Sequence, residues 1–396
     1  MPQNLTNFDK ALKEWYGPKM VTVLNDLTKV LKLFTKNADQ TLAVDGRRVV
    51  FPIHHGRNAG VGAIGESNTL PVADYQQTSE VRIPYRWNYL RVRLSAQVMK
   101  ASETSKGAFK KAMTLEMQRG INDLARSRNR QLFGWGVGML CRVSGQQASG
   151  TTLNVKNGLG VSSNGGVAPA RYIRPGDNIV FVRNTTPTSA LDADIVASSV
   201  SDTVDSLNTT INTITFDAAT GATLNDNDML IFSPGDSSTQ SSVNREVMGL
   251  LGLVDDGTYL TTLFNISRST VPEWKSSVIA LNGDLTFQAL QRVESLVNRN
   301  QGGLINQLIS EHAVRDEYIR QTIVAKRFVG PQNMKPDAGI FAGGLTDQVE
   351  WNGHGWMADH MCPFGTVFFL DTSTLERYVN CEGEWANEDG SILGRV

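Results

Sequence analysis

The chain has 396 residues, of which 40% are hydrophobic and 19% charged, and its formal net charge is −1. This composition predicts an ordinary folded protein of two or three packed units, and it argues against a disordered chain and against a dedicated nucleic-acid binder, which would be clearly basic. The apolar runs are far shorter than the roughly 20 residues of a membrane-spanning helix, and the first residues lack the apolar core of a secretory signal. Without a membrane span or a signal we expect a cytosolic product. Three scattered cysteines without a C-x-x-C pair indicate neither a disulfide framework nor a zinc site.

The first third of the chain alternates between helical and β-like patterns. Apolar residues at three- and four-residue steps predict an amphipathic helix within residues 8–35, after the Gly17-Pro18 break. Two β-like segments follow, at residues 47–54 and 80–98. In the second segment, apolar and aromatic residues alternate with arginines, which predicts one long strand with a wet or partner-facing side.

Between these two segments lies GVGAIGES, residues 60–67, which matches the G-x-G-x-x-G pattern of dinucleotide sites. Such a site requires that the glycines join a buried strand to a helix whose amides face the phosphates. Glu80 stands where the acidic ribose partner should stand, but the glycines are followed by a proline-containing stretch and a strand. We therefore interpret the motif as the tip of a hairpin and expect no cofactor there.

A long helix is predicted from Thr104 to Phe133, where apolar residues form one stripe. Basic residues occupy much of its remaining surface. A solvated face is the simplest interpretation of these charges, and weak, sequence-independent contact with nucleic acid is the alternative. The candidate DNA-facing residues are Lys106, Lys110, Lys111, Arg126, Arg128 and Arg130.

From Ser144 to Val243 the sequence is rich in Ser, Thr, Asn, Gly and Asp between short apolar runs, which predicts a small all-β unit with tight turns. Two of its stretches, PGDNIVF and DNDMLIF, echo each other as a turn that leads into a buried strand. After Arg245 the pattern predicts an α/β region with a helix in LTFQALQRVESLVNRNQGG, a strand in LINQLIS, a helix in EHAVRDEYIRQTIV and a late strand and turn in TVFFLDTSTLERYV.

A second group of residues, in HGWMADHMC, carries side chains that can bind metals: His354, Asp359, His360 and Cys362. Two histidines six residues apart do not share a helical face, and no general base is indicated nearby. Polar loop residues and a packed cysteine are therefore the favoured interpretation, and a metal-dependent hydrolase that uses His354 and His360 is the alternative from another functional class.

Charge is distributed unevenly along the chain. Residues 47–130 carry 15 lysines and arginines against 6 acidic residues, a net of +9, whereas residues 344–396 carry 2 arginines against 9 acidic residues, a net of −7. Two solvated faces would explain this pattern, but attraction between the two regions, within a chain or between copies, would explain it equally well. The hypothesis is that Arg82, Arg86, Arg91 and Arg93 lie over acidic C-terminal surface of an adjacent subunit.

The predicted hairpin is long for a chain of this size. A compact chain of 396 residues has a radius of gyration of about 21 Å, whereas each arm of a hairpin over residues 47–94 could reach up to roughly 75 Å. An isolated two-stranded ribbon is marginally stable in water. The hairpin therefore needs a surface to lie on, and a neighbouring copy is the expected source.

The order of these elements, a short arm, a glycine-tipped hairpin, a very long helix and an α/β domain, resembles the major capsid proteins of tailed bacteriophages, a fold shared with encapsulins and herpesvirus shells. The resemblance implies an α+β fold with an N-terminal arm, an extended E-loop, a spine helix, and peripheral (P) and axial (A) domains. Its regions would be residues 1–40 (arm), 41–79 (E-loop), 80–143 (P-domain strand and spine helix), 144–243 (an inserted β-domain) and 244–396 (A-domain with a C-terminal return).

By this resemblance the protein would be a non-enzymatic shell subunit without cofactor or metal, which forms hexamers and pentamers around double-stranded DNA, in the virion capsid after assembly in the host bacterial cytoplasm. Implied partners are other copies, a separate scaffolding protein, a portal protein and a cement or decoration protein, with no membrane and no large maturation cleavage. Isopeptide cross-linking from the E-loop is excluded, since no lysine lies between Lys36 and Lys100. An encapsulin-type compartment and a tail or neck component are the alternatives.

The candidate intersubunit contacts are Trp15, Phe51, Gly60, Gly62, Gly65, Glu66, Arg82, Arg86, Trp87, Arg91 and Arg93. Further aromatic anchors are Phe34, Tyr85 and Tyr89, and an internal core position is the alternative for each aromatic residue.

Overall fold

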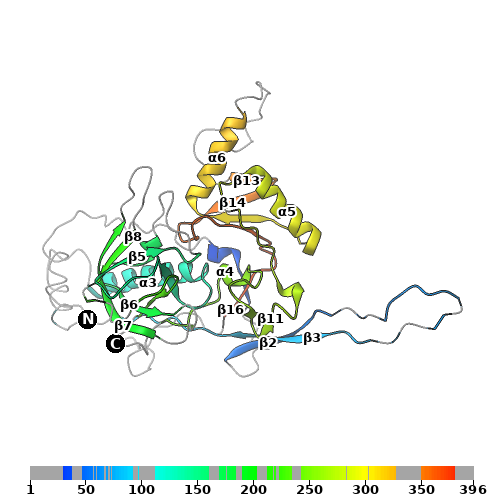
Figure 1. The fold of residues 1–396 in the computed structure, drawn as a ribbon, viewed down its shortest axis with the longest axis horizontal. Helices are drawn as coiled ribbons and strands as arrows, with labels where there is room; N and C mark the ends of the chain where they lie inside the picture. The colour runs from blue at the N-terminus through cyan, green and yellow to red at the C-terminus, as the bar shows by residue number, and fades with distance from the viewer. Residues whose placement is uncertain are drawn as a thin grey trace. The chain divides into compact units, whose positions relative to one another are not determined.

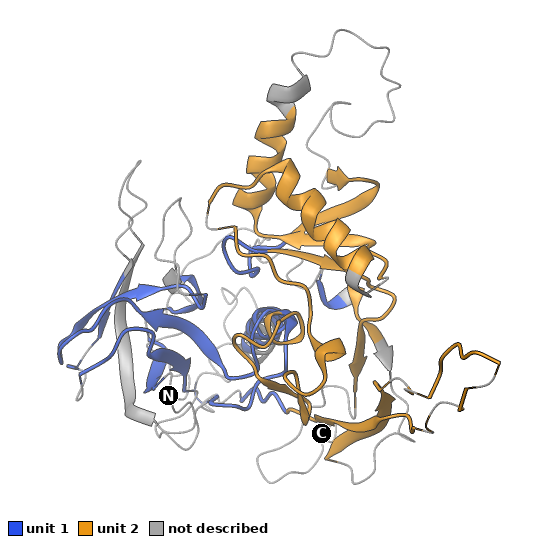
Figure 2. Cartoon of the chain, turned by 45° about the vertical axis from the view of Figure 1, so that its right-hand side comes forward, with its two compact units in different colours: residues 1–32, 87–250, 359–366 blue, residues 33–86, 251–358, 367–396 orange. Residues whose placement is uncertain are grey.

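The chain divides into two compact units in the computed structural model, which Figure 2 colours separately. The first unit comprises residues 1–32, 87–250 and 359–366, and the second comprises residues 33–86, 251–358 and 367–396. The structure describes residues 30–37, 47–56, 58, 60–66, 68–69, 72, 74–91, 97, 112–159, 169–174, 176–183, 190–202, 212–216, 218–219, 223–233, 242–281, 283–301, 303–326 and 349–379.

The first unit is built around a closed β-barrel with the strand order β4-β5-β8-β7-β6-β9 (Figure 1). Its strands are β4 (Met139–Val143), β5 (Thr152–Lys156), β6 (Asn178–Val182), β7 (Ala190–Asp202), β8 (Asn212–Phe216) and β9 (Met229–Phe232), and the 3-10 helix η3 (Pro169–Tyr172) precedes β6. The β structure predicted from Ser144 onward therefore begins earlier, because β4 pairs with both β5 and β9 and closes the barrel.

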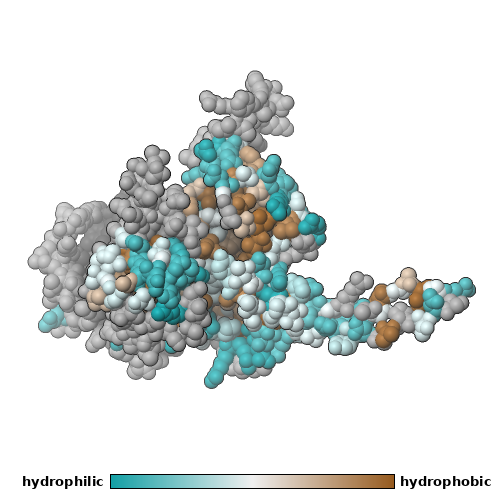
Figure 3. All heavy atoms as spheres, in the orientation of Figure 1, coloured by the Kyte–Doolittle hydropathy of each residue, from teal (hydrophilic) through white to brown (hydrophobic). Residues whose placement is uncertain are grey.

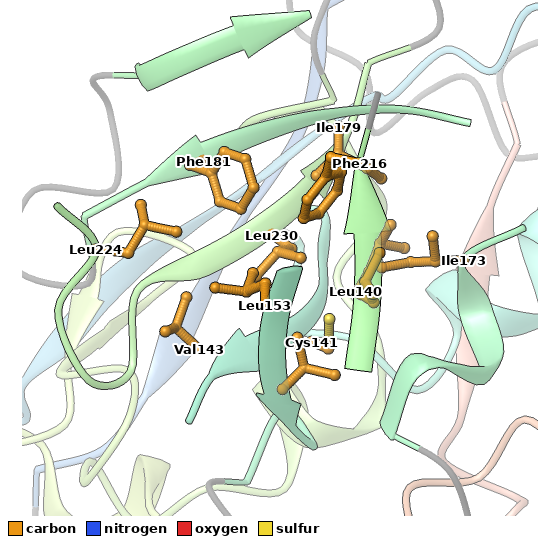
Figure 4. Close-up of a cluster of buried hydrophobic side chains, with 12 residues drawn as sticks. Leu140, Cys141, Val143, Leu153, Ile173, Ile179, Phe181, Phe216, Leu224 and Leu230 are labelled. Carbon is orange, nitrogen blue, oxygen red and sulfur yellow. The ribbon is translucent and has the colours of Figure 1, made fainter. Parts of the chain in front are cut away.

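Apolar side chains fill the interior of the barrel. Figure 4 shows Leu153, Ile179, Phe181 and Leu230 directed toward one another, and each is at most 2% exposed. The rings of Phe181 and Phe216 meet edge to face with centroids 5.5 Å apart, a favoured arrangement of aromatic pairs. This dense core explains why short apolar runs separated by polar turns form a stable unit.

The pairings of the barrel repeat along the chain. The antiparallel pair β4–β5 has its counterpart in β7–β8, and the pair β6–β7 has its counterpart in β9–β4. The two remaining pairs, β5–β8 and β6–β9, join equivalent strands of the two halves. Exchange of β4, β5 and β6 with β7, β8 and β9 thus maps four pairings of the barrel onto one another and the remaining two onto themselves, so that the barrel has pseudo-twofold connectivity.

The echoing stretches of sequence are the turns that lead into β6 and β9. In the first turn, the amide of Arg174 donates to Asp177 Oδ2 at 2.7 Å, and the amide of Asp177 donates to the Arg174 carbonyl at 3.1 Å. In the second, Asn225 and Asp228 make the same two bonds at 2.8 and 3.2 Å. The residue before each aspartate has a positive φ, 93° at Gly176 and 70° at Asn227.

The helix α3 (Ala112–Gln131) also belongs to the first unit and leads into the barrel. Residues 101–111 lie outside the described residues, so the predicted start of this helix at Thr104 is not tested. Its predicted close at the following glycine cluster is confirmed. Gly138 has a φ of 93° there, and a Cβ atom on it would lie 2.6 Å from the carbonyl oxygen of Ser242, so only glycine fits.

The second unit contains a four-stranded sheet in the order β13-β14-β12-β15, with two helices packed against it. The predicted helices and strands of this region are present. Tyr318 contacts Phe287 and Trp351 edge to face, and Trp356 is 1% exposed. The elements are α5 (Phe287–Gln301), β12 (Gln307–Ser310), α6 (His312–Lys326), β13 (Val349–Trp351), β14 (His354–Ala358) and β15 (Val367–Leu370).

The second unit also holds the predicted hairpin, formed by β2 (Arg48–His54) and β3 (Thr78–Pro84). The remaining elements of the chain are the 3-10 helix η1 (Val30–Leu33), β1 (Thr35–Asn37), α4 (Leu250–Leu253), β10 (Thr262–Leu263), β11 (Ile266–Ser267), the 3-10 helix η5 (Pro272–Trp274) and β16 (Glu376–Tyr378).

Two predictions from periodicity are wrong in part. Residues 8–29 of the expected amphipathic helix lie outside the described residues, and its last part is the 3-10 turn Val30–Leu33 followed by the strand β1, because Thr35–Asn37 pair in parallel with Glu376–Tyr378. The long strand expected over residues 80–98 ends at Pro84. The ladder ends there because Pro84 pairs with Arg48, the first residue of β2, and one further bond from the Tyr85 amide to the Arg47 carbonyl follows it.

Candidate assembly surfaces

The hairpin β2–β3 is fixed at its base by a small apolar cluster. Val81 is 1% exposed and packs with Ile266 and Val271, and the partly buried Phe51 and Ile83 cover them. The amide of Arg82 donates to the carbonyl of Phe264 at 3.0 Å, which ties β3 to the turn between β10 and β11. Phe51, a predicted contact residue, also lies 6.4 Å from the ring of Tyr378, so it serves the base of the hairpin.

A buried arginine holds together the segment that carries this cluster. The side chain of Arg268 is 0% exposed, and its guanidinium donates to Asp255 Oδ2 at 3.1 Å. It also donates to the carbonyls of Gly252, Leu253, Leu260 and Trp274, so all of its N–H groups have acceptors. Burial lowers the pKa of the Arg268 guanidinium, which the carboxylate of Asp255 opposes.

Beyond His54 the two arms of the hairpin continue as an extended loop that Figure 1 shows running past the end of the sheet. The amides of His55 and Gly56 both donate to the Gln77 carbonyl, at 3.0 and 3.2 Å. A Cβ atom on Gly56 would lie 2.3 Å from Cβ of Gln77, so the close approach of the arms requires glycine here. Farther out, Asn58 donates to the Asp74 carbonyl at 2.8 Å and accepts from the Gly60 amide at 2.7 Å.

The glycine motif lies at the tip of this loop, with exposed residues at Gly62, Gly65 and Glu66. Gly62 has open space around its Cα, and nothing in the motif leads into a helix, so the geometry of a dinucleotide site is absent from these residues. The tip instead carries large apolar side chains in water, visible as brown atoms on the extended loop in Figure 3. Their exposed fractions are 72% for Val61, 45% for Ile64, 87% for Val72 and 74% for Tyr75.

The charged candidates on β3 and just beyond its end differ from one another. Arg82 donates to both carboxylate oxygens of Glu80 on the same face of the strand, at 3.2 and 3.0 Å. This bond lowers the pKa of Glu80 and raises the pKa of Arg82, and both side chains are exposed to solvent. The positive charge of Arg82 is thus largely balanced within the hairpin, whereas Arg86 is exposed.

In the first unit, Trp87 and Tyr89 are exposed by 52% and 85%. Asn88 between them exchanges two hydrogen bonds with Gln131 of α3, at 3.2 and 3.0 Å. Leu90 packs on Gly120, where a Cβ atom would lie 2.9 Å from the leucine side chain. Asn88 and Leu90 therefore contact the helix, while Asn88 remains exposed to solvent together with Trp87, Tyr89 and Arg91. Two further predicted contacts, Trp15 and Arg93, lie outside the described residues.

The basic candidates on α3 also separate into different environments. Arg128 is exposed, whereas the pKa of Arg126 is lowered by burial and by the nearby charge of Arg174. Arg130 forms an ion pair with Glu246 in which the side chains are only 12% and 6% exposed, and this leaves little of Arg130 for an external ligand. The lysines named as DNA-facing, Lys106, Lys110 and Lys111, lie outside the described residues.

The residues considered for metal binding have other partners. Asp359 accepts two hydrogen bonds from Nδ2 of Asn129, each 3.1 Å long, and Cys362 is buried. His354 lies 3.6 Å from Glu294, and His360 lies 3.7 Å from Asp359. Across the described ranges, no three His, Cys, Asp or Glu side chains are grouped so that they could hold a metal ion.

The structure brings out residues that the sequence did not single out. These are Gly56, Asp255 and Arg268, whose roles depend on contacts with residues distant in the sequence. A local sequence pattern does not predict such contacts. The sequence around Trp87 and Tyr89 predicted part of a long strand, whereas these residues join no strand in the structure. The apolar tip residues were also visible, since a surface loop that carries valine, isoleucine and tyrosine is unusual for a turn.

No helix in the described part of the chain is long and apolar enough to span a bilayer. No protein-family model matches the sequence. No curated protein matches it at a significant level either. Among solved structures, the chain is similar to the "Cyanophage A-1(L) capsid asymmetric unit", with a TM-score of 0.50 over 93% of this chain and 77% of that one, at 10% sequence identity. The chain thus has a mixed helix and sheet fold similar to that of a phage capsid structure.

Proposed function

We propose that this protein is the major capsid subunit of a tailed bacteriophage, a structural protein without enzymatic activity. The similarity of its fold to a cyanophage capsid chain over most of its length carries this proposal. The apolar tip of the β2–β3 hairpin supports it independently, because side chains as exposed as Val72 and Tyr75 mark a surface that another molecule covers.

In this function, each subunit contributes several modest contacts that act together. Residues 41–79 would form an E-loop whose tip lies on a neighbouring copy, and α3 would be the spine helix. No single interface needs to be strong, since a closed shell makes all of them at once and gains from their multivalency. Without a lysine between Lys36 and Lys100, these contacts would remain noncovalent.

The finer assignments are proposals of the same kind. Residues 1–40 would be the arm, 80–143 the P-domain strand and spine, 144–243 the inserted β-domain and 244–396 the A-domain with its C-terminal return. The copies would form hexamers and pentamers around double-stranded DNA, with weak contacts from Arg128 of α3. A scaffolding protein, a portal protein and a cement protein would be the partners, and assembly would take place in the bacterial cytoplasm.

The test is to express the full chain in bacteria, with and without the products of neighbouring genes, and to examine the product by negative-stain electron microscopy. Closed icosahedral shells are the expected result. A protein that stays monomeric at high concentration in both low and high salt would contradict the proposal, and rings or tubes would indicate a tail or neck component instead.

The contents of the particles separate the remaining alternatives. Double-stranded DNA in particles from infected cells is expected, whereas a protein cargo without DNA would indicate an encapsulin-type compartment. Metal analysis of the purified chain addresses the hydrolase. If the chain binds a stoichiometric metal and shows a hydrolase activity that His360→Ala abolishes, the hydrolase is correct and the structural function is wrong.

A further inference from the structure

Trp87–Leu90 form a segment that joins no strand among the described residues. The segment continues from β3 without joining a strand, and its residues Asn88 and Leu90 contact Gln131 and Gly120 of α3. Within the described part of the chain, the backbone amides and carbonyls of Trp87–Leu90 make no hydrogen bond. Exposed backbone groups of an extended segment are a template on which another extended segment can add as a strand.

The side chains of this segment are held in place before any partner arrives. The paired amides of Asn88 and Gln131 and the packing of Leu90 on Gly120 fix the inner side of the segment. Trp87 and Tyr89 remain exposed to solvent, as does Arg91 beyond Leu90. Exposed tryptophan, tyrosine and arginine are the residue types that most often dominate the energy of protein interfaces. A preordered backbone also lowers the entropy cost of binding.

We propose that Trp87–Arg91, called here the docking strip, pairs with the C-terminal segment of a second copy of this chain, residues 380–396. This inference rests on the proposed function, because it requires self-association. The occupant adds as an extended strand beside the strip. Its acidic side chains then face Arg91.

Charge complementarity selects this segment over the other end of the chain. Residues 87–131 contain ten lysines and arginines against three acidic residues. Residues 380–396 contain four acidic residues against one arginine, a net of −3, whereas residues 1–29 have a net of +1. An acidic segment is attracted to this basic part of the chain, and the charge pairs help to fix its register. A basic segment would be repelled.

The sequence of the C-terminal segment also fits a strand. In Cys381-Glu382-Gly383-Glu384-Trp385 the acidic side chains alternate with the others, so that both carboxylates lie on one face of an extended chain. Pairing beside Trp87, Tyr89 and Arg91 places Glu382 or Glu384 opposite the arginine, and cross-strand pairs of opposite charge stabilise a sheet.

The test places a photo-cross-linking benzoyl-phenylalanine at position 89 of the full chain. Particles assembled from a mixture of isotopically light and heavy copies are irradiated, and the linked peptides are identified by mass spectrometry. The expected product joins position 89 to a peptide within residues 380–396, in mixed light and heavy pairs that prove contact between copies. The same probe at Tyr259, which is 48% exposed in the other unit, is the control and should not yield this product.

The outcomes separate the inference from the proposed function. Particles that form normally but give cross-links only to DNA, to another segment, within one copy, or to nothing would overturn the docking strip and leave the capsid function intact. Failure of the unmodified chain to form particles would contradict the capsid function, and the inference with it.

A charge exchange provides a second readout. In the chain with the probe at position 89, Arg91→Glu is expected to reduce the cross-link to the C-terminal segment at least several-fold. A further Glu382→Lys and Glu384→Lys exchange in the same chain should restore it. An unchanged yield in the Arg91→Glu chain, or no recovery in the exchanged chain, contradicts the pairing of Arg91 with this segment.

Discussion

Arg268 and Asp255 form an ion pair that is closed to solvent on both sides, with Nη1 of the arginine 3.1 Å from Oδ2 of the aspartate. The aspartate also accepts from the amides of Gly257 and Leu260. The pair therefore fixes the chain between α4 and β11, where Ile266 and Val271 form the bed of the hairpin. Breaking a buried ion pair whose donors are all satisfied strongly destabilises a fold, because removal of one partner leaves the other charge buried and unpaired.

Arg268→Ala should destabilise the second unit by roughly 3 to 5 kcal/mol, because Asp255 is left buried without its counter-charge and four carbonyls lose their donor. Hydrogen exchange of residues 251–274 should increase strongly while the barrel of the first unit stays protected. Arg268→Lys keeps the charge but not the planar array of donors, so an intermediate effect is expected. Equal protection in Arg268→Ala and the parent chain would contradict this role.

Gly56→Ala should open the outer end of the β2–β3 ladder, since the new Cβ atom would lie 2.3 Å from Cβ and 2.9 Å from the amide nitrogen of Gln77. Gly62→Ala is the matched control, because nothing lies within 4 Å of the Cβ position there. Exchange rates of the His55 and Gly56 amides report the difference. Similar rates in both variants would show that the arms do not approach as closely as described.

Val72→Asp should abolish or strongly reduce particle formation while the free subunit keeps its stability within about 0.5 kcal/mol, because the side chain is 87% exposed before assembly. Burial of one valine is worth about 1.5 to 3 kcal/mol, and a charge in its place reverses that gain. Val72→Ile is the conservative control and should assemble normally. Particle yield by sedimentation and subunit melting together separate an interface defect from a folding defect.

The contact that the apolar hairpin tip makes with another copy should depend only weakly on salt. The tip is apolar and the charge of Arg82 is balanced by Glu80, so sodium chloride has little attraction to screen at this place. We expect the particle yield of the parent chain to survive molar salt, even where the contact proposed for Arg91 weakens. Dissociation of particles by moderate salt would contradict this prediction and would indicate that contacts of the arginines, rather than of the apolar tip, dominate the stability of the interface.

The sequence predicted elements best where local pattern and tertiary pairing agree. Residues 307–310 and 312–326 follow this rule, since a short apolar run becomes β12 in the middle of a sheet and the next segment becomes α6. The barrel strands were visible because apolar runs alternate with turn residues. Their closed order was not visible, because it depends on which strands meet far apart in the chain.

The failures have the opposite cause. The alternation of residue types in residues 85–91 predicted a strand with two different faces, but residues 86–89 are all exposed. A strand also needs a partner, and the ladder ends where β2 begins at Arg48. At residues 30–35 the apolar steps suit a helix, yet pairing with Glu376–Tyr378 draws Thr35–Asn37 into a strand. Candidate site residues were predicted by type, whereas Gly56 and Arg268 are set by contacts between distant segments.

The two equivalent turns of the barrel allow a matched test of charge. Asp177 and Asp228 make the same backbone bonds, but Asp228 also accepts from Arg183 Nη1 at 2.8 Å, and its side chain is 3% exposed. Asp228→Asn should therefore destabilise the barrel by about 1.5 to 3 kcal/mol at neutral pH, the usual loss for a hydrogen bond between charged groups. Asp177→Asn should be neutral or stabilising there.

The stability that Asp177 contributes to its turn is expected to depend on pH. Burial raises the pKa of Asp177 above its usual value of about 3.9, so the folded chain binds the proton more tightly than the unfolded chain does. The stability that this group contributes is present below that usual value and is lost as pH rises through the raised pKa. Asparagine does not titrate, so the stability of Asp177→Asn relative to the parent chain should increase from pH 4 to pH 7, as measured by hydrogen exchange of β6. A constant or falling difference would contradict the assignment, as would equal losses for Asp177→Asn and Asp228→Asn.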